Sequence, residues 1–285
     1  MNITLRQGRP EDAQRAGTIC YEAFTAIAEQ HRFPPDCPSA EVAIGLLSSL
    51  LARKDIYSVV AEIDGRVIGS NFLWENATIA GIGPITVDPQ VQNGQVGKQL
   101  MNNVLERTRA QGFAGVRLVQ AAYHNRSLSL YSKLGFIVRE PLSILQGQAL
   151  GFESKGFGVR QATERDVEAC NRLCRTVHGH ERNHELLDAI KHETASVVDR
   201  DGRVSGYATS IGFFGHAVGE TNEDLKALIG AATSIAGPGL LMPSRNAELF
   251  QWCLNRGLRI VEPMTLMSVG LYNEPAGAFL PSIIY

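Results

Sequence analysis

The chain has 285 residues, 44% of them hydrophobic, and a formal net charge of −2; this composition predicts one large or two ordinary folded domains and argues against a disordered chain. Its 27 basic and 29 acidic residues nearly balance, so no nucleic-acid partner is expected. No apolar run approaches the roughly 18 residues of a membrane span, so no membrane partner is expected.

The first third of the chain reads as a strand, a helix and a hairpin. Residues Ile3–Gln7 are strand-like, and Pro10-Glu11-Asp12 opens a helix, because proline and acidic residues are favoured in a first helical turn. Two apolar runs follow, Tyr57–Ile63 and Val67–Trp74, and the Asp64-Gly65 between them is a hairpin signal.

The next part alternates strands and helices. Residues Ile82–Val87 predict one apolar strand, and a helical face that begins at Val96 ends at Gly112. A strand over Gly115–Gln120 and a short helix closed by Gly135 come next. Strands joined both by hairpins and through helices predict an α/β fold with a mixed sheet flanked by helices.

The chain also repeats itself. Three segments recur in the same order: Leu5-Arg6-Gln7 as Val159-Arg160-Gln161, Asp64-Gly65-Arg66-Val67 as Asp201-Gly202-Arg203-Val204, and Gly135 with Glu140-Pro141 as Gly257 with Glu262-Pro263. Chance explains any one match but explains all three in order poorly. We therefore predict two tandem domains, 1–147 and 157–285, joined by a linker at 148–156.

The segment Val87–Lys98 is the first that carries chemistry. It follows a strand, which Pro89 ends, and it begins a helix. Small and polar residues there leave backbone N–H groups pointing out of a helix N-terminus, an arrangement that binds phosphate, and Lys98 adds a cation. The alternative is an ordinary turn between a strand and a helix.

This segment resembles the acyl-CoA pyrophosphate loop of the GNAT superfamily of N-acetyltransferases, whose pattern is Gln/Arg-x-x-Gly-x-Gly/Ala after a strand. Gln92 and Gly97 match its first and last positions, while Gln95 stands at the inner glycine and a glycine lies one residue earlier. The resemblance implies acetyl-CoA as cosubstrate, with its pantetheine arm paired to backbone groups of Ile85 and Val87. The implied loop contacts are Gln92, Asn93, Gly94, Gln95, Val96, Gly97 and Lys98.

A second segment, residues 121–136, resembles the family pattern Asn-x-x-Ala-x-x-Leu-Tyr-x-Lys-x-Gly-Phe. Its tyrosine is Tyr131, and His124 and Ser127 stand at the asparagine and alanine positions. The resemblance implies that His124 and Ser127 contact the cofactor and that Tyr131 lies near its sulfur. A phenol there can protonate the thiolate that leaves. The alternatives are a core tyrosine and a helix-capping histidine.

The general base is less defined. Glu75 follows an apolar strand and is our candidate to deprotonate the amine. His31, in the loop region after the first helix, is a second candidate, and a chain of water molecules is a third. Either side chain is also compatible with a simple solvated surface role.

Two further groups of residues are read as structural. His178, His180, His184 and His192 form a histidine-rich patch without a catalytic metal motif, so a solvated helix is preferred and no metal is expected. Cys20 and Cys174 recur at equivalent places on predicted helices and are read as small core residues.

The second copy is expected not to bind acyl-CoA. Cys253 stands opposite Tyr131 in the repeat (131 + 122 = 253), and Glu220, Glu223 and Asp224 precede its apolar helix. Acidic side chains at a helix start repel a pyrophosphate. Copy two is therefore expected to complete the acceptor pocket, support copy one or form a subunit contact.

The sequence thus predicts an N-acetyltransferase that moves an acetyl group from acetyl-CoA to a primary amine of a small molecule or peptide by direct attack. An acyl-CoA-binding regulatory or scaffold protein without turnover is the alternative. Five cysteines without paired spacing and an N-terminus without a secretory pattern favour the cytoplasm. A monomer and a homodimer are both compatible with the sequence.

Overall fold

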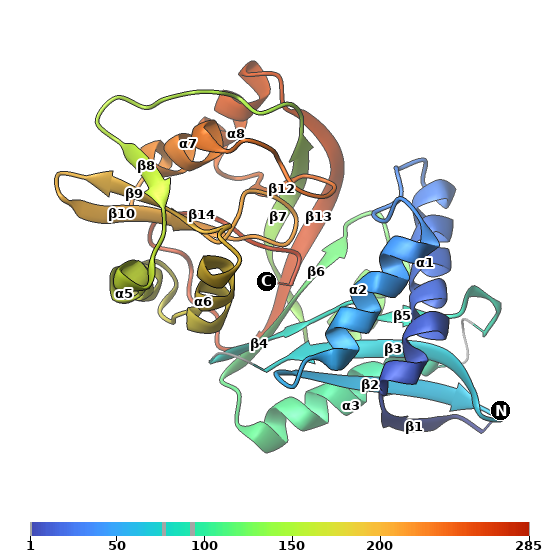
Figure 1. Cartoon of the computed structure of the whole chain (residues 1–285). Helices are drawn as coiled ribbons and strands as arrows, with labels where there is room; N and C mark the ends of the chain where they lie inside the picture. Colours follow the sequence, from blue (N-terminus) through green and yellow to red (C-terminus); the bar gives the residue numbers. More distant parts are fainter. Residues whose placement is uncertain (1, 76–77, 92–94, 285) are drawn as a thin grey trace. The chain divides into compact units, whose positions relative to one another are not determined.

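The computed structural model describes residues 2–75, 78–91 and 95–284. Two compact units are present (Figure 1): one runs to Ile137 and takes in Ile284, and the other runs from Val138 to Ile283. Within the described ranges, no helix combines the length and the apolar character needed to cross a membrane.

The first unit alternates strands and helices as the sequence predicted. In chain order its elements are β1 (Thr4–Gln7), η1 (Pro10–Asp12), α1 (Ala13–Gln30), α2 (Ala40–Ala52), β2 (Ile56–Ile63), β3 (Arg66–Trp74), β4 (Ile79–Ile82), β5 (Thr86–Val87), η2 (Pro89–Val91), α3 (Val96–Gln111), β6 (Gly115–Ala121) and α4 (Asn125–Lys133). The predicted hairpin is confirmed, because Asp64 and Gly65 both take positive φ, 51° and 76°.

The sheet of the first unit runs in the order β1-β2-β3-β4-β6. Side chains alternate between its faces. Phe72 of β3 packs into a core cluster with Cys20 of α1 and Leu47 of α2, whereas the neighbouring Asn71 reaches the carbonyl of Leu100 in α3 at 3.5 Å. Helices α1 and α2 therefore cover one face of this sheet and α3 covers the other (Figure 1).

The strand predicted at Ile82–Val87 is wrong in one respect, because it is two strands. β4 ends at Ile82 and β5 covers only Thr86–Val87. Between them Gly83 has φ 142°, and Pro84 has no N–H to donate to a neighbouring strand. Both strands pair with β3, and β4 also pairs with β6.

The two units divide inside β7 (Ile137–Gln146), ahead of residue 147. β7 pairs antiparallel with β12 (Leu240–Pro243), a strand of the second unit, with Leu145 opposite Leu240. The segment 148–156 also packs there: the amide of Phe152 donates to the Gly230 carbonyl at 3.0 Å, and its ring meets that of Trp252 edge-on.

The second unit repeats the order of the first. Its remaining elements are β8 (Gly158–Gln161), η3 (Glu164–Asp166), α5 (Val167–His178), α6 (Asn183–Lys191), β9 (Ser196–Arg200), β10 (Arg203–Ala208), β11 (Ala217–Gly219), α7 (Asn222–Ala231), α8 (Ala247–Asn255), β13 (Arg259–Gly270) and β14 (Ala278–Leu280). A five-stranded sheet, β14-β11-β10-β9-β8, carries α5 on one face and α7 on the other.

The histidine patch is not a solvated helix. His178 and His180 are each only 5% exposed, so that prediction is wrong for them, although His184 is exposed as expected. The described residues hold no group of three or more histidine, cysteine or acidic side chains placed to bind a metal ion. Cys20 and Cys174 are buried in the cores of their units, which confirms their structural reading.

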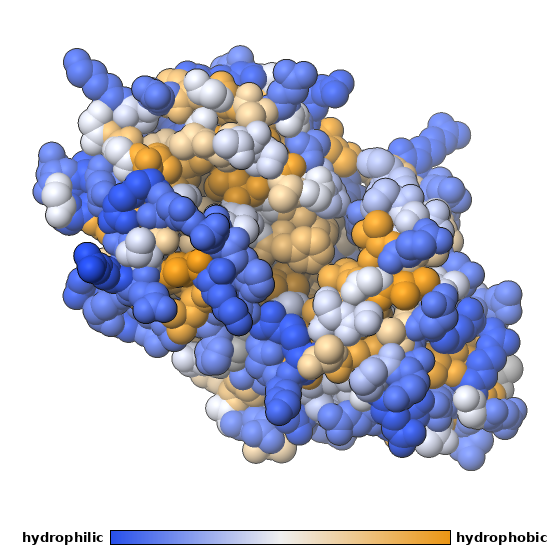
Figure 2. Space-filling view, in the orientation of Figure 1, coloured by the Kyte–Doolittle hydropathy of each residue, from blue (hydrophilic) through white to orange (hydrophobic). Residues whose placement is uncertain are grey.

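Hydrophilic residues cover most of the face of the molecule seen in Figure 2, and apolar residues show through in smaller patches, one of them over α1 and α2. Scattered apolar patches of this kind are ordinary on folded proteins.

Candidate active site

The sheet of the first unit opens after β4. β6 runs parallel to β4, with Ile79 opposite Gly115 and Gly81 opposite Arg117. β5 pairs with β3 alone among the described strand pairings. Beyond Gly81, therefore, β6 no longer accompanies the strand, and the edge of β5 that faces away from β3 is not taken by β6.

Ile85 and Val87 direct their backbone groups toward that edge. Asp88 donates its amide to the Ile68 carbonyl at 2.8 Å, and Thr86 lies opposite Ser70. Hydrogen-bonded and non-bonded pairs alternate along an antiparallel ladder, so Val87 turns its amide and carbonyl away from β3. Ile85 lies two residues earlier and has the same direction.

Helix α3 begins beside β5, and no side-chain cap is found at its N-terminus in the described part of the chain. Its N-cap is Gln95, whose side chain makes no capping hydrogen bond, and its first turn contains no acidic residue. Gly97 lies between β5 and α4: a Cβ there would be 3.8 Å from Val87 and 3.6 Å from Leu130. Val96 is buried and Lys98 is exposed. The predicted residues Gln92, Asn93 and Gly94 lie outside the described residues.

Gln95 adopts a backbone conformation that suits glycine. Its φ and ψ are 63° and 6°, the left-handed region. An L-residue with a Cβ is destabilised by about 1–2 kcal/mol in this region, whereas glycine is not. This difference explains the glycine of the family pattern at this position, where this chain has Gln95.

Replacing Gln95 with glycine is expected to raise the free energy of unfolding by about 1 kcal/mol, since the relieved strain exceeds the extra flexibility of glycine in the unfolded chain. Chemical denaturation measures the change. Gln95→Ala is the control, because it removes the side chain but keeps the Cβ and should give no gain. Equal stability of the two variants would contradict the argument.

Ser127 and Tyr131 share one face of α4, because they are four positions apart, and His124 is the N-cap residue before the helix. Tyr131 is 6% exposed, and burial raises the pKa of its phenol above the ordinary value. Its hydroxyl has no hydrogen-bond partner in the described part of the chain. The structure thus holds a protonated, unengaged phenol.

Gln120 of β6 is a site neighbour that the sequence analysis missed. The Ser127 hydroxyl lies 2.8 Å from Oε1 of Gln120 and 2.9 Å from the His124 carbonyl. Gln120 is 6% exposed, and its Nε2 is buried without a partner in the described residues. Two features of the sequence could have indicated this contact: a glutamine in an otherwise apolar strand, and a serine at the alanine position of the family pattern.

Glu75, the predicted base, is held in an ion pair. Nε and Nη2 of Arg107 donate to its two carboxylate oxygens at 2.6 and 2.7 Å. The Arg107 guanidinium also lies over the Tyr57 ring, 4.5 Å from its centroid. One guanidinium thus engages both oxygens of the Glu75 carboxylate in charge-assisted hydrogen bonds. This geometry favours a structural role for Glu75.

His31 meets the residues before α4 through aromatic contacts. It caps the C-terminus of α1, and its ring lies 5.3 Å from that of Tyr123. Phe33 stacks on the same tyrosine at 4.4 Å, with the planes only 10° apart. These contacts hold the loop after α1 against Tyr123, the residue before His124.

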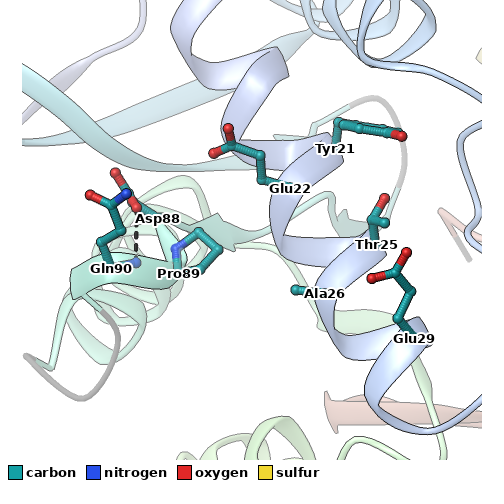
Figure 3. A pocket seen from close by; sticks show the side chains of 8 residues that line it. All are labelled: Tyr21, Glu22, Thr25, Ala26, Glu29, Asp88, Pro89 and Gln90. Carbon is teal, nitrogen blue, oxygen red and sulfur yellow. Dashed lines mark hydrogen bonds between the residues drawn. The ribbon is translucent and has the colours of Figure 1, made fainter.

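A pocket of about 370 Å³ lies between α1 and the segment after β5 (Figure 3). Its lining residues are Tyr21, Glu22, Thr25, Ala26, Glu29, Asp88, Pro89 and Gln90. Asp88 is buried and paired with Arg15 at 2.5 Å and Arg66 at 2.8 Å. The sequence analysis missed this pocket, because Glu22 and Glu29 are exposed helix residues without a motif of their own.

The second copy differs from the first at the positions that correspond to Tyr131, the α3 N-terminus and the edge of β5. Cys253 is fully buried at the place of Tyr131. At the N-terminus of α7, the Asp224 carboxylate accepts hydrogen bonds from the amide and hydroxyl of Thr221, both at 2.8 Å, so the helix supplies its own anion. β14 pairs with β11, with Val218 opposite Phe279, and takes the strand edge that a pantetheine arm would need.

Similarity to known proteins agrees with this geometry. Residues 19–136 match the family model described as the Acetyltransferase (GNAT) family. An IAA acetyltransferase of Azospirillum brasilense is 31% identical over 118 residues, which are 40% of this chain and 76% of that protein.

Two solved structures share the fold of the whole chain. A candidate acetyltransferase from Pyrococcus horikoshii has a TM-score of 0.74 at 15% identity, covering 99% of this chain and 92% of its own. A GCN5-related N-acetyltransferase from Sphaerobacter thermophilus has a TM-score of 0.62 at 13% identity, covering 97% and 98%. The chain therefore belongs to the GNAT acetyltransferase family and is an acyl-CoA-dependent N-acetyltransferase with acetyl-CoA as its cosubstrate.

Proposed function

We propose that the chain transfers the acetyl group to a primary amine of a small molecule or peptide by direct attack, and that the working site lies in the first copy, residues 1–147. The observation that carries this proposal is Tyr131: a buried phenol with a raised pKa and an unengaged hydroxyl, on the helix α4 whose Leu130 lies beside Gly97.

The residues of the first unit fit the cofactor. The uncapped N-terminus of α3 offers backbone donors to the pyrophosphate, with Lys98 as a nearby cation. The outward backbone groups of Ile85 and Val87 suit the amides of the pantetheine arm, as an added strand. His124 and Ser127 of the α4 segment are proposed to contact the same pantetheine arm.

The reaction needs no covalent enzyme intermediate. The neutral amine attacks the acetyl carbon, a backbone amide at the edge of β5 polarises the carbonyl, and Tyr131 protonates the sulfur as the C–S bond breaks. A phenol with a raised pKa stays protonated at neutral pH, which is the form needed for this step.

The experiment that tests the function is a transfer assay. Purified protein and acetyl-CoA are mixed with spermidine, putrescine, tryptamine and a hexapeptide with a free α-amine, and free thiol is followed. Acetylated product identified by mass spectrometry supports the proposal. Binding of acetyl-CoA without transfer to any amine would instead favour the alternative, a binding protein without turnover, for which the departure at Gln95 is the supporting feature.

Acetyl-CoA is expected to raise the melting temperature. A ligand that binds only the folded state adds about 2.7 kcal/mol of stability at a hundredfold excess over its Kd. Thermal unfolding with and without millimolar acetyl-CoA measures the shift, and desulfo-CoA lacking the acetyl group should give a similar one. No shift and no calorimetric signal would contradict the cofactor site.

A further inference from the structure

The ammonium form of an amine has no lone pair, so the proposed reaction needs a group that accepts a proton. Glu75 is committed to Arg107 through both carboxylate oxygens. The proton of the ammonium therefore needs an acceptor other than Glu75.

His124 has the placement that the base requires. It is the N-cap of α4, with φ −85° and ψ 78°, and its side chain makes no capping hydrogen bond. Its imidazole is half-buried and has no hydrogen-bond partner among the described residues, so a ring nitrogen can accept. Tyr131 follows seven positions later in α4, about 10 Å along the axis at 1.5 Å per residue. An acetyl group between the two side chains has an acid at one end and a base at the other.

We propose that His124 is the general base of acetyl transfer and takes the proton of the acceptor ammonium through one water molecule. This inference rests on the proposed function and names a residue for its first step.

The surroundings of His124 keep its imidazole neutral. Burial lowers the pKa of this histidine below 6.5, and the charges of Arg126 on α4 and His31 at the end of α1 lower it further. Tyr123, the preceding residue, carries the ring contacts to His31 and Phe33 and holds the loop after α1 close by. A neutral imidazole at neutral pH is the form that a base must have.

The protons balance as follows in the proposed step. The ammonium loses one proton to His124, which later releases it to water. The nitrogen lone pair then forms the C–N bond, and the C–S electron pair leaves on sulfur, which takes the Tyr131 proton. The second proton lost by the nitrogen as the amide forms returns to the phenolate through solvent. One proton is released overall.

The test is the pH dependence of kcat/KM for wild type and His124→Asn with spermidine as the acceptor. An amine with a pKa near 10 is only about one part in a thousand free base at pH 7. Wild type should reach a plateau above the histidine pKa, below pH 6.5. His124→Asn should instead rise tenfold per pH unit toward the amine pKa, so that its loss is about 10³-fold at pH 7 and small near pH 10.

A second variant checks the assignment from the opposite direction. Arg126→Gln removes a charge that lowers the pKa of His124, so that pKa should rise. Because the neutral form is the active one, the acid limb of the wild-type profile should move to higher pH.

The outcomes separate the inference from the function on which it rests. If His124→Asn lowers the rate equally at every pH, or raises the Kd for CoA with an unchanged profile, His124 is a cofactor contact and the inference is overturned. If wild type acetylates no amine at any pH, the proposed function itself fails.

Discussion

Replacing Tyr131 with phenylalanine is expected to lower kcat by roughly 10²–10³-fold, the range of general acid catalysis. The Kd for CoA should stay nearly constant. The phenol is proposed to act on charge that exists only while the thioester breaks, and the loss of such an interaction appears in kcat rather than in ground-state binding.

The fold should tolerate this change. The Tyr131 hydroxyl has no hydrogen-bond partner among the described residues, so phenylalanine breaks no protein hydrogen bond there. The ring contact with Phe136, 6.1 Å between centroids, remains available. A fall in kcat with an unchanged melting temperature is thus the expected pattern, measured by thiol release and thermal unfolding.

Tyr207→Phe is the matched control. It removes a hydroxyl from another buried tyrosine, one that lies 3.0 Å from Nε2 of the buried His216 in the second unit. This variant should lose stability, because a buried imidazole nitrogen loses its partner, yet keep its turnover. Wild-type turnover by Tyr131→Phe would show that Tyr131 is only a packing residue.

Most of the secondary structure could be predicted from short stretches of adjacent residues. The hairpin at Asp64-Gly65 was readable because its turn needs two positive φ angles, and the ends of α3 and α4 were readable from Gly112 and Gly135, with φ 75° and 92°. Such features depend on a few adjacent residues, and their cause lies in the backbone of those residues.

Features that depend on distant partners were not readable in the same way. The pairing of β7 with β12 joins Leu145 to Leu240, and neither strand shows locally which sheet it enters. The ion pair that engages Glu75 comes from Arg107, and nothing next to Glu75 indicates that partner. The burial of His178 and His180 likewise follows from packing rather than from helical periodicity.

The candidate site was readable where the chemistry coincides with a backbone requirement. A phosphate-binding loop needs a turn that leads into a helix, and the sequence pattern around Gly97 is typical of such a turn. The pocket along α1 has no such requirement: Glu22 and Glu29 are ordinary exposed helix residues, and only the fold brings Asp88 to them.

CoA is expected to bind with a stoichiometry of one per chain. Copy one offers an uncapped helix without acidic residues in its first turn. In copy two, Asp224 already caps the equivalent helix, and its other oxygen accepts from Ser205 at 2.5 Å. Since β14 also pairs with β11, both the phosphate donors and the strand edge are taken. Titration calorimetry with CoA measures the ratio, and a value of two would contradict the assignment of copies.

Gly97→Glu should abolish this single binding event. It places a carboxylate at the second position of α3, as Glu223 stands at the second position of α7. Two unit charges 4 Å apart repel by about 4 kcal/mol at an effective dielectric of 20, on the order of a 10³-fold rise in Kd. Gly97→Ala is the control: its Cβ would meet Leu130 and Val87 at ordinary contact distances, so CoA should still bind. Binding that survives Gly97→Glu, or is lost equally in Gly97→Ala, would mean that the pyrophosphate does not dock at α3.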